Sequence, residues 1–544
     1  MVAIEGGWNY GDVLDAVADA VPGDKPALIH GDRVVTWSAF AARTNRLARA
    51  LYAHGAEAGD KVAFYLRNHP AYSETLTAAF KGRLTHVNVN YRYVDEELYY
   101  IFDNSDAKVV VYGSEFADNV AALKDRLPKV AIWIEVGDDG TPSVEGALDY
   151  ETLCTEGDGN PLAIERSGDD MLFLYTGGTT GMPKGVMWRL DDHWHAGTAG
   201  ATPATNLVPP NTLAEHVENV RAAGGGGRLI PCCPLMHGTG LFTAIGTLAQ
   251  GGTILTLTGA SFDAKECLEA ITRWQATNLA IVGDAFAKPL LAELDANGNT
   301  YDVSSLLGML SSGVMWSMEV KQGLLRHNVN MVLTDSFGAS EAVGFGRSDT
   351  TAAGTVETAR FVLGEHCKVF TEDFREVKAG DPEPGFIARG GAIPLGYFKD
   401  DEKTKKTFPI IDGARYSMPG DWVRVEADGT LVLLGRGSVC INTAGEKVYP
   451  EEVEETLKEH ADVEDALVVG VPDDKWGQMV TAVVALREGA ELDEAGLRAH
   501  ARAHLAGYKT PKRVLARATL GRASNGKADY KRITAYAKSE LGIA

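Results

Sequence analysis

Short apolar runs alternate with amphipathic helical patterns along this chain. Strand-like runs lie at 61–66 (KVAFYL), 108–112 (KVVVY) and 252–257 (GTILTL), whereas residues 38–54 show a helical pattern. Strands that alternate with helices usually form a largely parallel sheet covered by those helices. The pattern therefore predicts an α/β fold. Because 544 residues are too many for one hydrophobic core, we expect several subdomains.

The overall composition argues against several classes of protein. Lys and Arg number 52 and Asp and Glu 74, and the resulting charge of -22 disfavours nonspecific binding to nucleic acid or anionic lipid. The six cysteines show no CxxC spacing, which favours reduced thiols. The first ten residues, MVAIEGGWNY, do not resemble a signal peptide, and no apolar stretch approaches the roughly 18 residues of a membrane helix. We expect a cytoplasmic protein with no nucleic-acid partner and no stable membrane insertion; its oligomeric state is left open.

The segment FLYTGGTTGMPKG, at 173–185, concentrates glycine and threonine residues directly after an apolar, strand-like run. Glycines let backbone N–H groups converge on a ligand, threonine hydroxyls add donors, and Lys184 adds a positive charge. A Walker A loop is excluded, because Lys184 is followed by Gly185 and not by the Ser or Thr that meets magnesium. Compared with a plain glycine-rich turn, the threonines and the lysine favour a loop that binds phosphate.

The character of the chain changes near residue 435. The segment LVLLGRGS ends a strand-like run in two glycines around Arg436, and Pro450 then begins a helical pattern with acidic residues in its first turn. A hinge at this point would leave a carboxyl-terminal unit of about 110 residues, the usual size of a small domain. We therefore predict one domain at 1–435 and a second at 436–544.

The cluster DHWH, at 192–195, has the residue types of a metal site. Its spacing lacks a second pair of ligands. We therefore interpret it as the exposed start of a helix.

The loop segment YTGGTTGMPKG resembles the phosphate-loop signature of the adenylate-forming superfamily, which includes acyl-CoA synthetases, luciferases and peptide-synthetase adenylation domains. Four further blocks follow in the order of that family: FGASE at 337–341, YSMPGD at 416–421, GR at 435–436 and SNGK at 524–527. The segments NVNYRYVDEEL and AGYKTPK are most similar in sequence to the branch of bulky-acid and steroid side-chain acyl-CoA ligases. The resemblance covers essentially the whole chain. It implies a large adenylation domain of several subdomains and a small, mobile α+β carboxyl-terminal domain.

The resemblance also implies an activity and its cofactors. Enzymes of the family use ATP and Mg²⁺ to convert a carboxylic acid into an acyl-adenylate. An acyl-CoA synthetase then transfers the acyl group to coenzyme A. The segment GEKVYP, at 445–450, is similar to a block of acyl-CoA synthetases and favours the thiol acceptor. We therefore expect an AMP-forming acyl-CoA ligase of fatty acid or steroid metabolism. Two alternatives stay open: an adenylating synthetase that uses an amine acceptor, and a silent binding homologue.

The resemblance assigns roles to individual residues. The implied catalytic residues are Lys527, Glu341, Thr176 and Lys184, and Glu341 is also the implied magnesium ligand. Lys527 would stabilise charge that develops only in the transition state. The implied nucleotide-binding residues are Thr176, Thr179, Thr180, Lys184, Ser336, Phe337, Gly338, Ser340, Asp421, Arg436 and Lys527.

The pocket for the acid is expected from the segments 283–287, 311–315 and 336–339. These segments are apolar with small residues interspersed and contain no cation, which suits a hydrophobic, bulky acid. The pocket residues that we predict are His237, Asp284, Ala285, Gly313 and Val314.

Two departures from the family pattern affect these assignments. Ser340 stands where the family usually has threonine, which keeps the hydroxyl. Ser438 and Val439 stand where the family often has an acidic or lysine hinge residue, so the pivot is not identified and an amine acceptor stays open.

Overall fold

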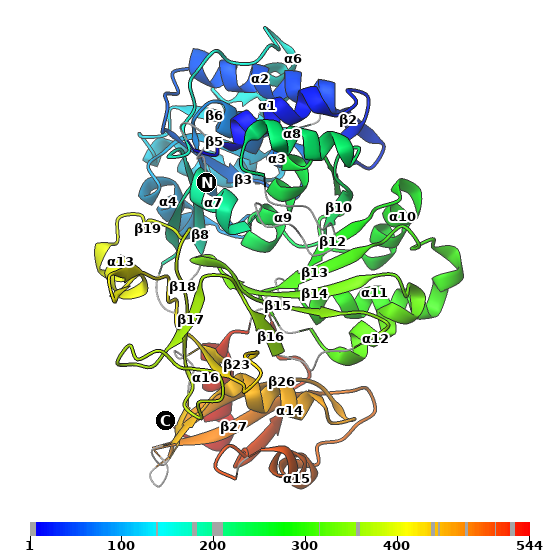
Figure 1. Cartoon of the computed structure of the whole chain (residues 1–544), viewed down its shortest axis with the longest axis vertical. Helices are drawn as coiled ribbons and strands as arrows, with labels where there is room; N and C mark the ends of the chain where they lie inside the picture. The colour runs from blue at the N-terminus through cyan, green and yellow to red at the C-terminus, as the bar shows by residue number, and fades with distance from the viewer. Residues whose placement is uncertain are drawn as a thin grey trace. The chain divides into compact units, whose positions relative to one another are not determined.

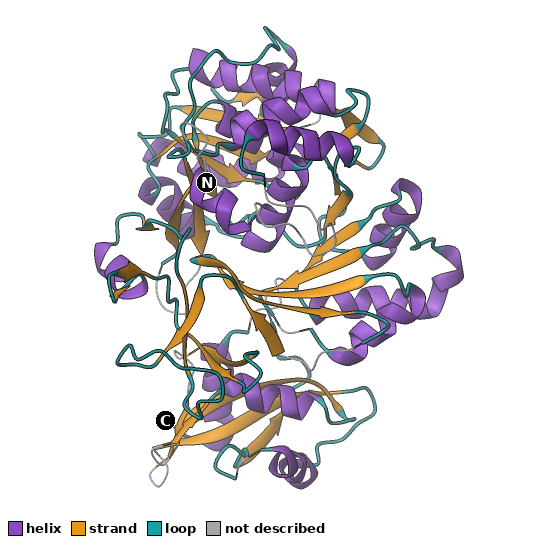
Figure 2. Cartoon of the chain, in the orientation of Figure 1, coloured by secondary structure: helices purple, strands orange, loops and turns teal. Residues whose placement is uncertain are grey.

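The computed structural model describes residues 7–137, 140–176, 182–197, 210–314, 316–354, 360–436, 441–443, 446–473, 477–505, 507–522 and 528–543. The chain divides into two compact units. One comprises Met1–Thr358 and Gly390–Ser417, and the other comprises Ala359–Arg389 and Met418–Ala544. Both units combine helices with sheets (Figure 2), and the α/β class expected from the sequence is confirmed.

One sheet of the larger unit has the strand order β15-β14-β13-β12-β10-β11-β1-β2. The pairings from β14 to β1 are parallel, and antiparallel pairs close the two ends. Its strands are β1 (Pro26–His30), β2 (Arg33–Thr36), β10 (Arg228–Pro231), β11 (Thr253–Thr256), β12 (Asn278–Ile281), β13 (Gly308–Ser312), β14 (Val332–Ala339) and β15 (Ala342–Thr350).

The second sheet of this unit has eight strands in the order β19-β9-β8-β4-β3-β5-β6-β7. It is parallel from β8 to β7, whereas β8–β9 and β9–β19 are antiparallel. Its strands are β3 (Lys61–Tyr65), β4 (Thr85–Asn88), β5 (Ala107–Gly113), β6 (Ile132–Val136), β7 (Leu148–Asp149), β8 (Met171–Thr176), β9 (Lys184–Arg189) and β19 (Gly396–Tyr397); a separate hairpin joins β20 (Ile410–Ile411) and β21 (Ala414–Arg415).

Helices flank both sheets of the larger unit (Figures 1 and 2). The helix predicted at 38–54 is α2, where Thr36 accepts a hydrogen bond from the N–H of Ala39 at the amino-terminal cap. The helices are α1 (Tyr10–Ala20), α2 (Trp37–Ala53), α3 (Pro70–Lys81), α4 (Asp95–Asn104), α5 (Ala117–Leu123), α6 (Tyr150–Thr155), α7 (Leu190–Gly197), α8 (Leu213–Ala222), α9 (Gly238–Ala249), α10 (Ala264–Trp274), α11 (Asp284–Asn297), α12 (Met318–His327) and α13 (Asp401–Thr407), with 3-10 turns at Ser114–Phe116, Lys124–Arg126 and Gly298–Thr300.

The smaller unit contains two groups of strands. The first has the order β17-β18-β22-β23-β16 and is antiparallel. Its strands are β16 (Arg360–Leu363), β17 (Cys367–Phe370), β18 (Gly385–Arg389), β22 (Asp421–Val425) and β23 (Leu431–Arg436). The second is a five-stranded sheet of β24 (Ile441–Thr443), β25 (Glu446–Val448), β26 (Val463–Asp473), β27 (Gly477–Leu486) and β28 (Arg513–Ala516), accompanied by α14 (Pro450–Lys458), α15 (Glu494–His504) and α16 (Tyr530–Leu541).

Strand β26 is buried on both faces. Its successive side chains point to opposite sides of the sheet, and each side packs against helices. Ala466 and Val468 belong to one apolar cluster, which includes side chains of α14 and α15. Leu467 and Val469 belong to another, which includes side chains of α16. This explains why the central residues 466–471 (ALVVGV) are apolar without alternation, whereas the charged residues lie near the ends of the strand.

The start of the predicted second domain can be compared with the structure. Helix α14 begins at Pro450 and carries Glu451 and Glu452 in its first turn, as the sequence predicted. The boundary between residues 435 and 436 falls inside β23. The two compact units are defined by internal packing. The predicted boundary at 435/436 marks a domain that moves, which packing alone does not test, and it therefore stays a prediction.

The cluster at 192–195 lies in helix α7, as expected, but its exposure was predicted wrongly. His193 and Trp194 are fully buried. The hydroxyl of Tyr10 shares a hydrogen bond of 2.7 Å with Nδ1 of His193, and the ring of Trp8 stacks on Trp194. Burial lowers the pKa of His193 to about 3. An early segment of the chain covers this face of the helix, which local spacing could not reveal.

None of the helices that the structure describes combines the length and the apolar composition needed to cross a bilayer. The five described cysteines are buried, and none of them forms a disulfide bond within the described residues. The cytoplasmic location stays a prediction.

Candidate active site

The phosphate-loop segment begins and ends on two paired strands. Thr176 is the last residue of β8 and Lys184 is the first of β9, and the antiparallel register places them opposite one another. Thr179 and Thr180 lie outside the described residues. Both ends of the predicted loop are therefore fixed side by side in one hairpin.

Gly185 follows the lysine for a packing reason. A Cβ at this position would lie 2.7 Å from a ring carbon of Tyr175, which is too close for any side chain. The ring of Tyr175 is held by its hydroxyl, which donates a hydrogen bond of 2.8 Å to Asn104. Gly185, which excludes a Walker A loop in the sequence, is therefore required by the ring of Tyr175 on β8.

Lys184 forms an ion pair with Asp400. Asp400 is the amino-terminal cap of α13 and accepts a hydrogen bond of 2.9 Å from the N–H of Lys403. The side chain of Lys184 is 34% exposed, so its charge is accessible to an anionic ligand.

The FGASE block forms the tip of a β-hairpin. Phe337 and Gly338 lie in β14, and Ser340 and Glu341 form the turn that joins β14 to β15. A Cβ on Gly338 would lie 3.1 Å from the carbonyl oxygen of Ala342, so the hairpin is tight there. Glu341, at 8% exposed, is a carboxylate held in a largely buried position.

Three side chains hold the hairpin tip. The indole N–H of Trp188, on β9, donates to the carbonyl oxygen of Ser340 at 3.0 Å. The hydroxyl of Ser417 donates to the carbonyl oxygen of Glu341, and the hydroxyl of Tyr397 donates to its carboxylate, each at 2.6 Å. Because Trp188 lies in β9 and Tyr397 pairs with β9, the structure brings Glu341 to the strand that carries Lys184.

Asn88 connects the phosphate loop with the predicted acid pocket. Its amide nitrogen donates to the carbonyl oxygens of Tyr175 and Met236, at 2.9 and 2.7 Å, and its amide oxygen accepts from the N–H of Tyr175. The residue after Tyr175 is Thr176, and the residue after Met236 is His237, the amino-terminal cap of α9. Asn88 was not among the residues predicted from the sequence; a polar residue that ends the buried strand THVN was the available signal.

Two of the segments predicted for the acid pocket, 283–287 and 311–315, lie next to each other. They follow the carboxyl ends of the parallel strands β12 and β13, and the N–H of Gly283 donates to the hydroxyl of Ser311 at 2.9 Å. Asp284 begins α11, and its carboxylate accepts from the N–H and the hydroxyl of Ser317 at 3.0 and 3.1 Å. Gly313 has φ +92°, a conformation that other residues rarely adopt.

The remaining predicted pocket residues are Ala285, in the first turn of α11, and Val314, which is half-buried against the core. Their contact with an acid stays a prediction.

A buried cation lies close to these segments, although none of the segments contains one. Lys321, on α12, is paired with Asp335, on β14. Burial raises the pKa of Asp335, while the ammonium group of Lys321 opposes that change. The carboxylate of Asp335 neutralises the charge of Lys321. This neutralisation agrees with an apolar pocket nearby.

The smaller unit carries two of the predicted nucleotide-binding residues. Asp421, on β22, and Arg436, on β23, are opposite one another in an antiparallel register. Gly435 has φ +116°, and a Cβ there would clash with the carboxylate of Glu451. Lys527 lies outside the described residues.

The side chains around the hairpin tip are compatible with a magnesium ion. Among the described residues no group of three or more His, Cys, Asp or Glu side chains could hold a metal ion. Mg²⁺ prefers oxygen ligands and is usually held by one or two carboxylates together with substrate phosphates. A single carboxylate, Glu341, beside a phosphate loop therefore fits Mg²⁺.

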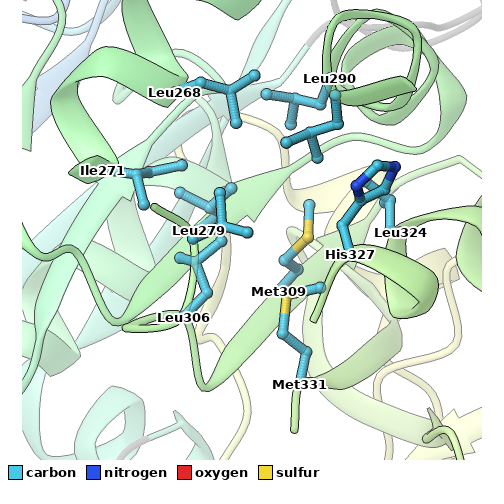
Figure 3. Close-up of a pocket in the computed structure, with 11 residues that line it drawn as sticks. Leu268, Ile271, Leu279, Leu290, Leu306, Met309, Leu324, His327 and Met331 are labelled. Atoms are coloured by element: carbon cyan, nitrogen blue, oxygen red, sulfur yellow. The ribbon is translucent and has the colours of Figure 1, made fainter. Parts of the chain in front are cut away.

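A small apolar cavity lies elsewhere in the larger unit (Figure 3). Side chains from α10, α11, α12, β12 and β13 line it, among them Leu268, Leu290 and Met309. It contains none of the residues predicted for the acid pocket.

Comparison with known proteins gives the following relationships. Residues 14–398 match the family of AMP-binding enzymes, and residues 452–527 match the AMP-binding enzyme C-terminal domain. The chain is 39% identical to the 3-oxocholest-4-en-26-oate–CoA ligase of Rhodococcus rhodochrous, over 98% of this chain and 96% of the relative. It is 40% identical to the medium/long-chain-fatty-acid–CoA/3-oxocholest-4-en-26-oate–CoA ligase of Mycobacterium marinum, over 96% and 95%. The crystal structure of the anthranilate CoA ligase AuaEII in complex with anthranoyl-AMP has the same fold, with a TM-score of 0.84, 21% identity and 99% of both chains covered.

Proposed function

This chain belongs to the AMP-binding enzyme family, and on that premise we propose that it is an ATP-dependent acyl-CoA ligase whose acid carries a sterol ring system. The general activity is that of an AMP-forming acid–thiol ligase, because relatives about 40% identical over nearly the whole chain are acyl-CoA ligases. ATP, coenzyme A and a carboxylic acid are its substrates.

The reaction has two half-reactions. In the first, an oxygen of the carboxylate bonds to the α-phosphorus of ATP as the bond to the leaving pyrophosphate breaks. In the second, the sulfur of coenzyme A bonds to the acyl carbon, its thiol proton is lost, and AMP leaves. Catalysis of the first step depends on charge stabilisation and on alignment of the nucleophile with the leaving group.

Residues of this chain supply both requirements. The hydroxyl of Thr176 and the ammonium group of Lys184, at the two ends of the loop, would bind the phosphates. Lys527 would stabilise charge on the carboxylate and the α-phosphate. The observation that carries this assignment is the hairpin that sets Thr176 opposite Lys184, with Glu341 held against the same strand β9.

The other assignments follow from the family resemblance. The adenine and ribose side of the nucleotide would contact residues that share two hairpins, namely Ser336, Phe337, Gly338, Ser340, Asp421 and Arg436. Loop residues Thr179 and Thr180 would add hydroxyl donors for the phosphates.

Glu341 would hold Mg²⁺. When bound, this ion supplies neutralising charge to the phosphate oxygens. The carboxylate of Glu341 is the anionic group that the described part of the hairpin tip offers for this purpose.

The sterol-type acid is inferred from the relatives and from the character of the pocket. Both relatives named above act on 3-oxocholest-4-en-26-oate, and one of them also acts on medium- and long-chain fatty acids. The predicted pocket segments are apolar, and the neighbouring cation Lys321 is neutralised by Asp335. Such a pocket favours a large hydrophobic acid over a small charged one.

The test is a pyrophosphate-release screen with a sterol side-chain acid, octanoate, palmitate and anthranilate. We expect kcat/KM for the sterol acid to exceed that for anthranilate by roughly tenfold or more. Each acid is tested with coenzyme A, with a primary amine and with neither acceptor, and the thioester or amide product is identified.

The outcomes separate the alternatives. Amide formation without a coenzyme A thioester would identify an amine-using synthetase. Failure of every acid to release pyrophosphate would identify a silent homologue. A clear preference for palmitate or octanoate would reject the sterol acid and keep the ligase.

Replacement of Glu341 by glutamine tests the magnesium assignment. A neutral amide cannot replace the charge that a carboxylate offers to a hard cation. We expect the Mg²⁺ concentration for half-maximal adenylation to rise by roughly tenfold or more, with a lower maximal rate. An unchanged magnesium titration would contradict the assignment.

A further inference from the structure

The short strand β19 and the residues after it contact two charged residues of the phosphate site, Glu341 and Lys184. Gly396 and Tyr397 pair with Met187 and Val186 of β9, far away in the sequence. Strand β19 is the edge strand of this sheet, and β9 lies between it and β8. The N–H of Phe398 extends the pairing by donating to the carbonyl oxygen of Gly185 at 2.8 Å.

Tyr397 reaches Glu341 with its hydroxyl group. The O–H donates to Oε1 of the carboxylate at 2.6 Å, and both side chains are buried. A hydrogen bond to an ionised acceptor is roughly twice as strong as one between neutral groups. The other carboxylate oxygen, Oε2, has no hydrogen-bond partner among the described residues. One oxygen of Glu341 is thus held by the protein, and the second is left for a ligand.

Helix α13, which follows β19, anchors the end of the strand. The N–H of Tyr397 donates to the hydroxyl of Thr404, on α13, at 2.8 Å. Asp400, which caps α13, forms the ion pair with Lys184. A segment anchored in this way keeps the hydroxyl of Tyr397 in a fixed position, as a group that orients a metal ligand requires.

We propose that Tyr397 is a positioning residue for magnesium binding, which orients the carboxylate of Glu341 by holding Oε1 so that Oε2 can coordinate the metal of the metal–nucleotide complex. This inference rests on the proposed function, since it adds a residue to the same phosphate site. The competing explanation is structural: the hydroxyl of Tyr397 merely satisfies a buried carboxylate.

The deciding measurement is binding, not turnover. The affinity for α,β-methylene-ATP, which cannot be cleaved between the α- and β-phosphates, is measured by calorimetry over a series of Mg²⁺ concentrations. The proteins compared are the wild type, Tyr397→Phe, Glu341→Gln and the double variant. Phenylalanine keeps the ring, which packs against Phe408, and removes only the hydroxyl.

We expect Tyr397→Phe to raise the Mg²⁺ concentration for half-maximal nucleotide binding by about tenfold or more, the usual effect of removing a group that orients a metal ligand. Binding in EDTA should stay within about twofold of the wild type, because the variant changes no predicted nucleotide contact. If Tyr397 acts through Glu341, the double variant should bind as Glu341→Gln alone does.

Tyr112 provides a matched control. Its hydroxyl also donates to a buried glutamate, Glu135, at 2.9 Å, but on strands β5 and β6 of the same sheet. Tyr112→Phe should lower the melting temperature by a similar amount and leave the Mg²⁺ dependence of nucleotide binding unchanged.

Two results would overturn the inference. One is a wild-type Mg²⁺ dependence in Tyr397→Phe together with the loss of stability seen in Tyr112→Phe. The other is a double variant whose effect is the sum of the two single effects. Absence of acid-dependent pyrophosphate release would reject the proposed function, whereas the binding experiment would still decide the role of Tyr397.

Discussion

Replacing Lys527 by alanine is expected to reduce the rate of acyl-adenylate formation on the order of a hundredfold or more. The match to the C-terminal domain of AMP-binding enzymes extends to this residue, and the resemblance gives it the contact to the carboxylate and the α-phosphate. Charge develops there only as the new bond forms, so the loss should appear in kcat more than in the affinity for either substrate. Acid-dependent pyrophosphate release is the measurement.

The second half-reaction provides the internal control for this variant. A preformed acyl-adenylate should still be converted to the thioester at close to the wild-type rate, because the role predicted for Lys527 belongs to the first half-reaction. Lys531, nearby in α16, gives a matched control for loss of a positive charge. Adenylation by Lys527→Ala within threefold of wild type, or an equal loss in Lys531→Ala, would remove Lys527 from the catalytic residues.

Replacing Arg43 by alanine is expected to destabilise the larger unit by about 3–5 kcal/mol. The side chain of Arg43 is 9% exposed and its partner Glu74 only 1%. Arg43 donates to both oxygens of Glu74, at 2.5 and 3.2 Å, and also to Glu151. Its removal leaves the Glu74 carboxylate buried, and the described residues then offer it one donor, the hydroxyl of Tyr150, at 2.9 Å. The free energy of unfolding in urea measures the loss.

Arg33 is the matched control for this prediction. It pairs with the same Glu151 at 3.1 Å, but the two side chains are 42% and 43% exposed. Exposed ion pairs of this kind contribute about 0–1 kcal/mol, so Arg33→Ala should change stability little. Equal destabilisation by the two variants would show that burial of Glu74 is not the cause.

Part of the active site was predictable because local sequence determines it. The apolar run before the glycines indicated a strand, and it forms β8, which pairs with β9 so that Thr176 lies opposite Lys184. The binding of phosphate by the loop stays a prediction. Helix α2 followed from apolar spacing and α14 from Pro450 and its acidic first turn. These signals operate over a few residues, which is the range in which backbone conformation and capping are decided.

Other features came only from the tertiary structure. Tyr397 and Glu341 are 56 residues apart, and Asn88 bonds to a carbonyl group 148 residues away. His193 looked exposed by its spacing and is buried by the segment around Tyr10. A side chain that bonds to a distant segment leaves no periodic trace in its own neighbourhood, because its partner is chosen by the packing of strands and helices. By itself the sequence determined the helices and strands and the residue types of the predicted site. The pairing of β4, β8, β9 and β19 in one sheet decided which polar groups hold those residues in place.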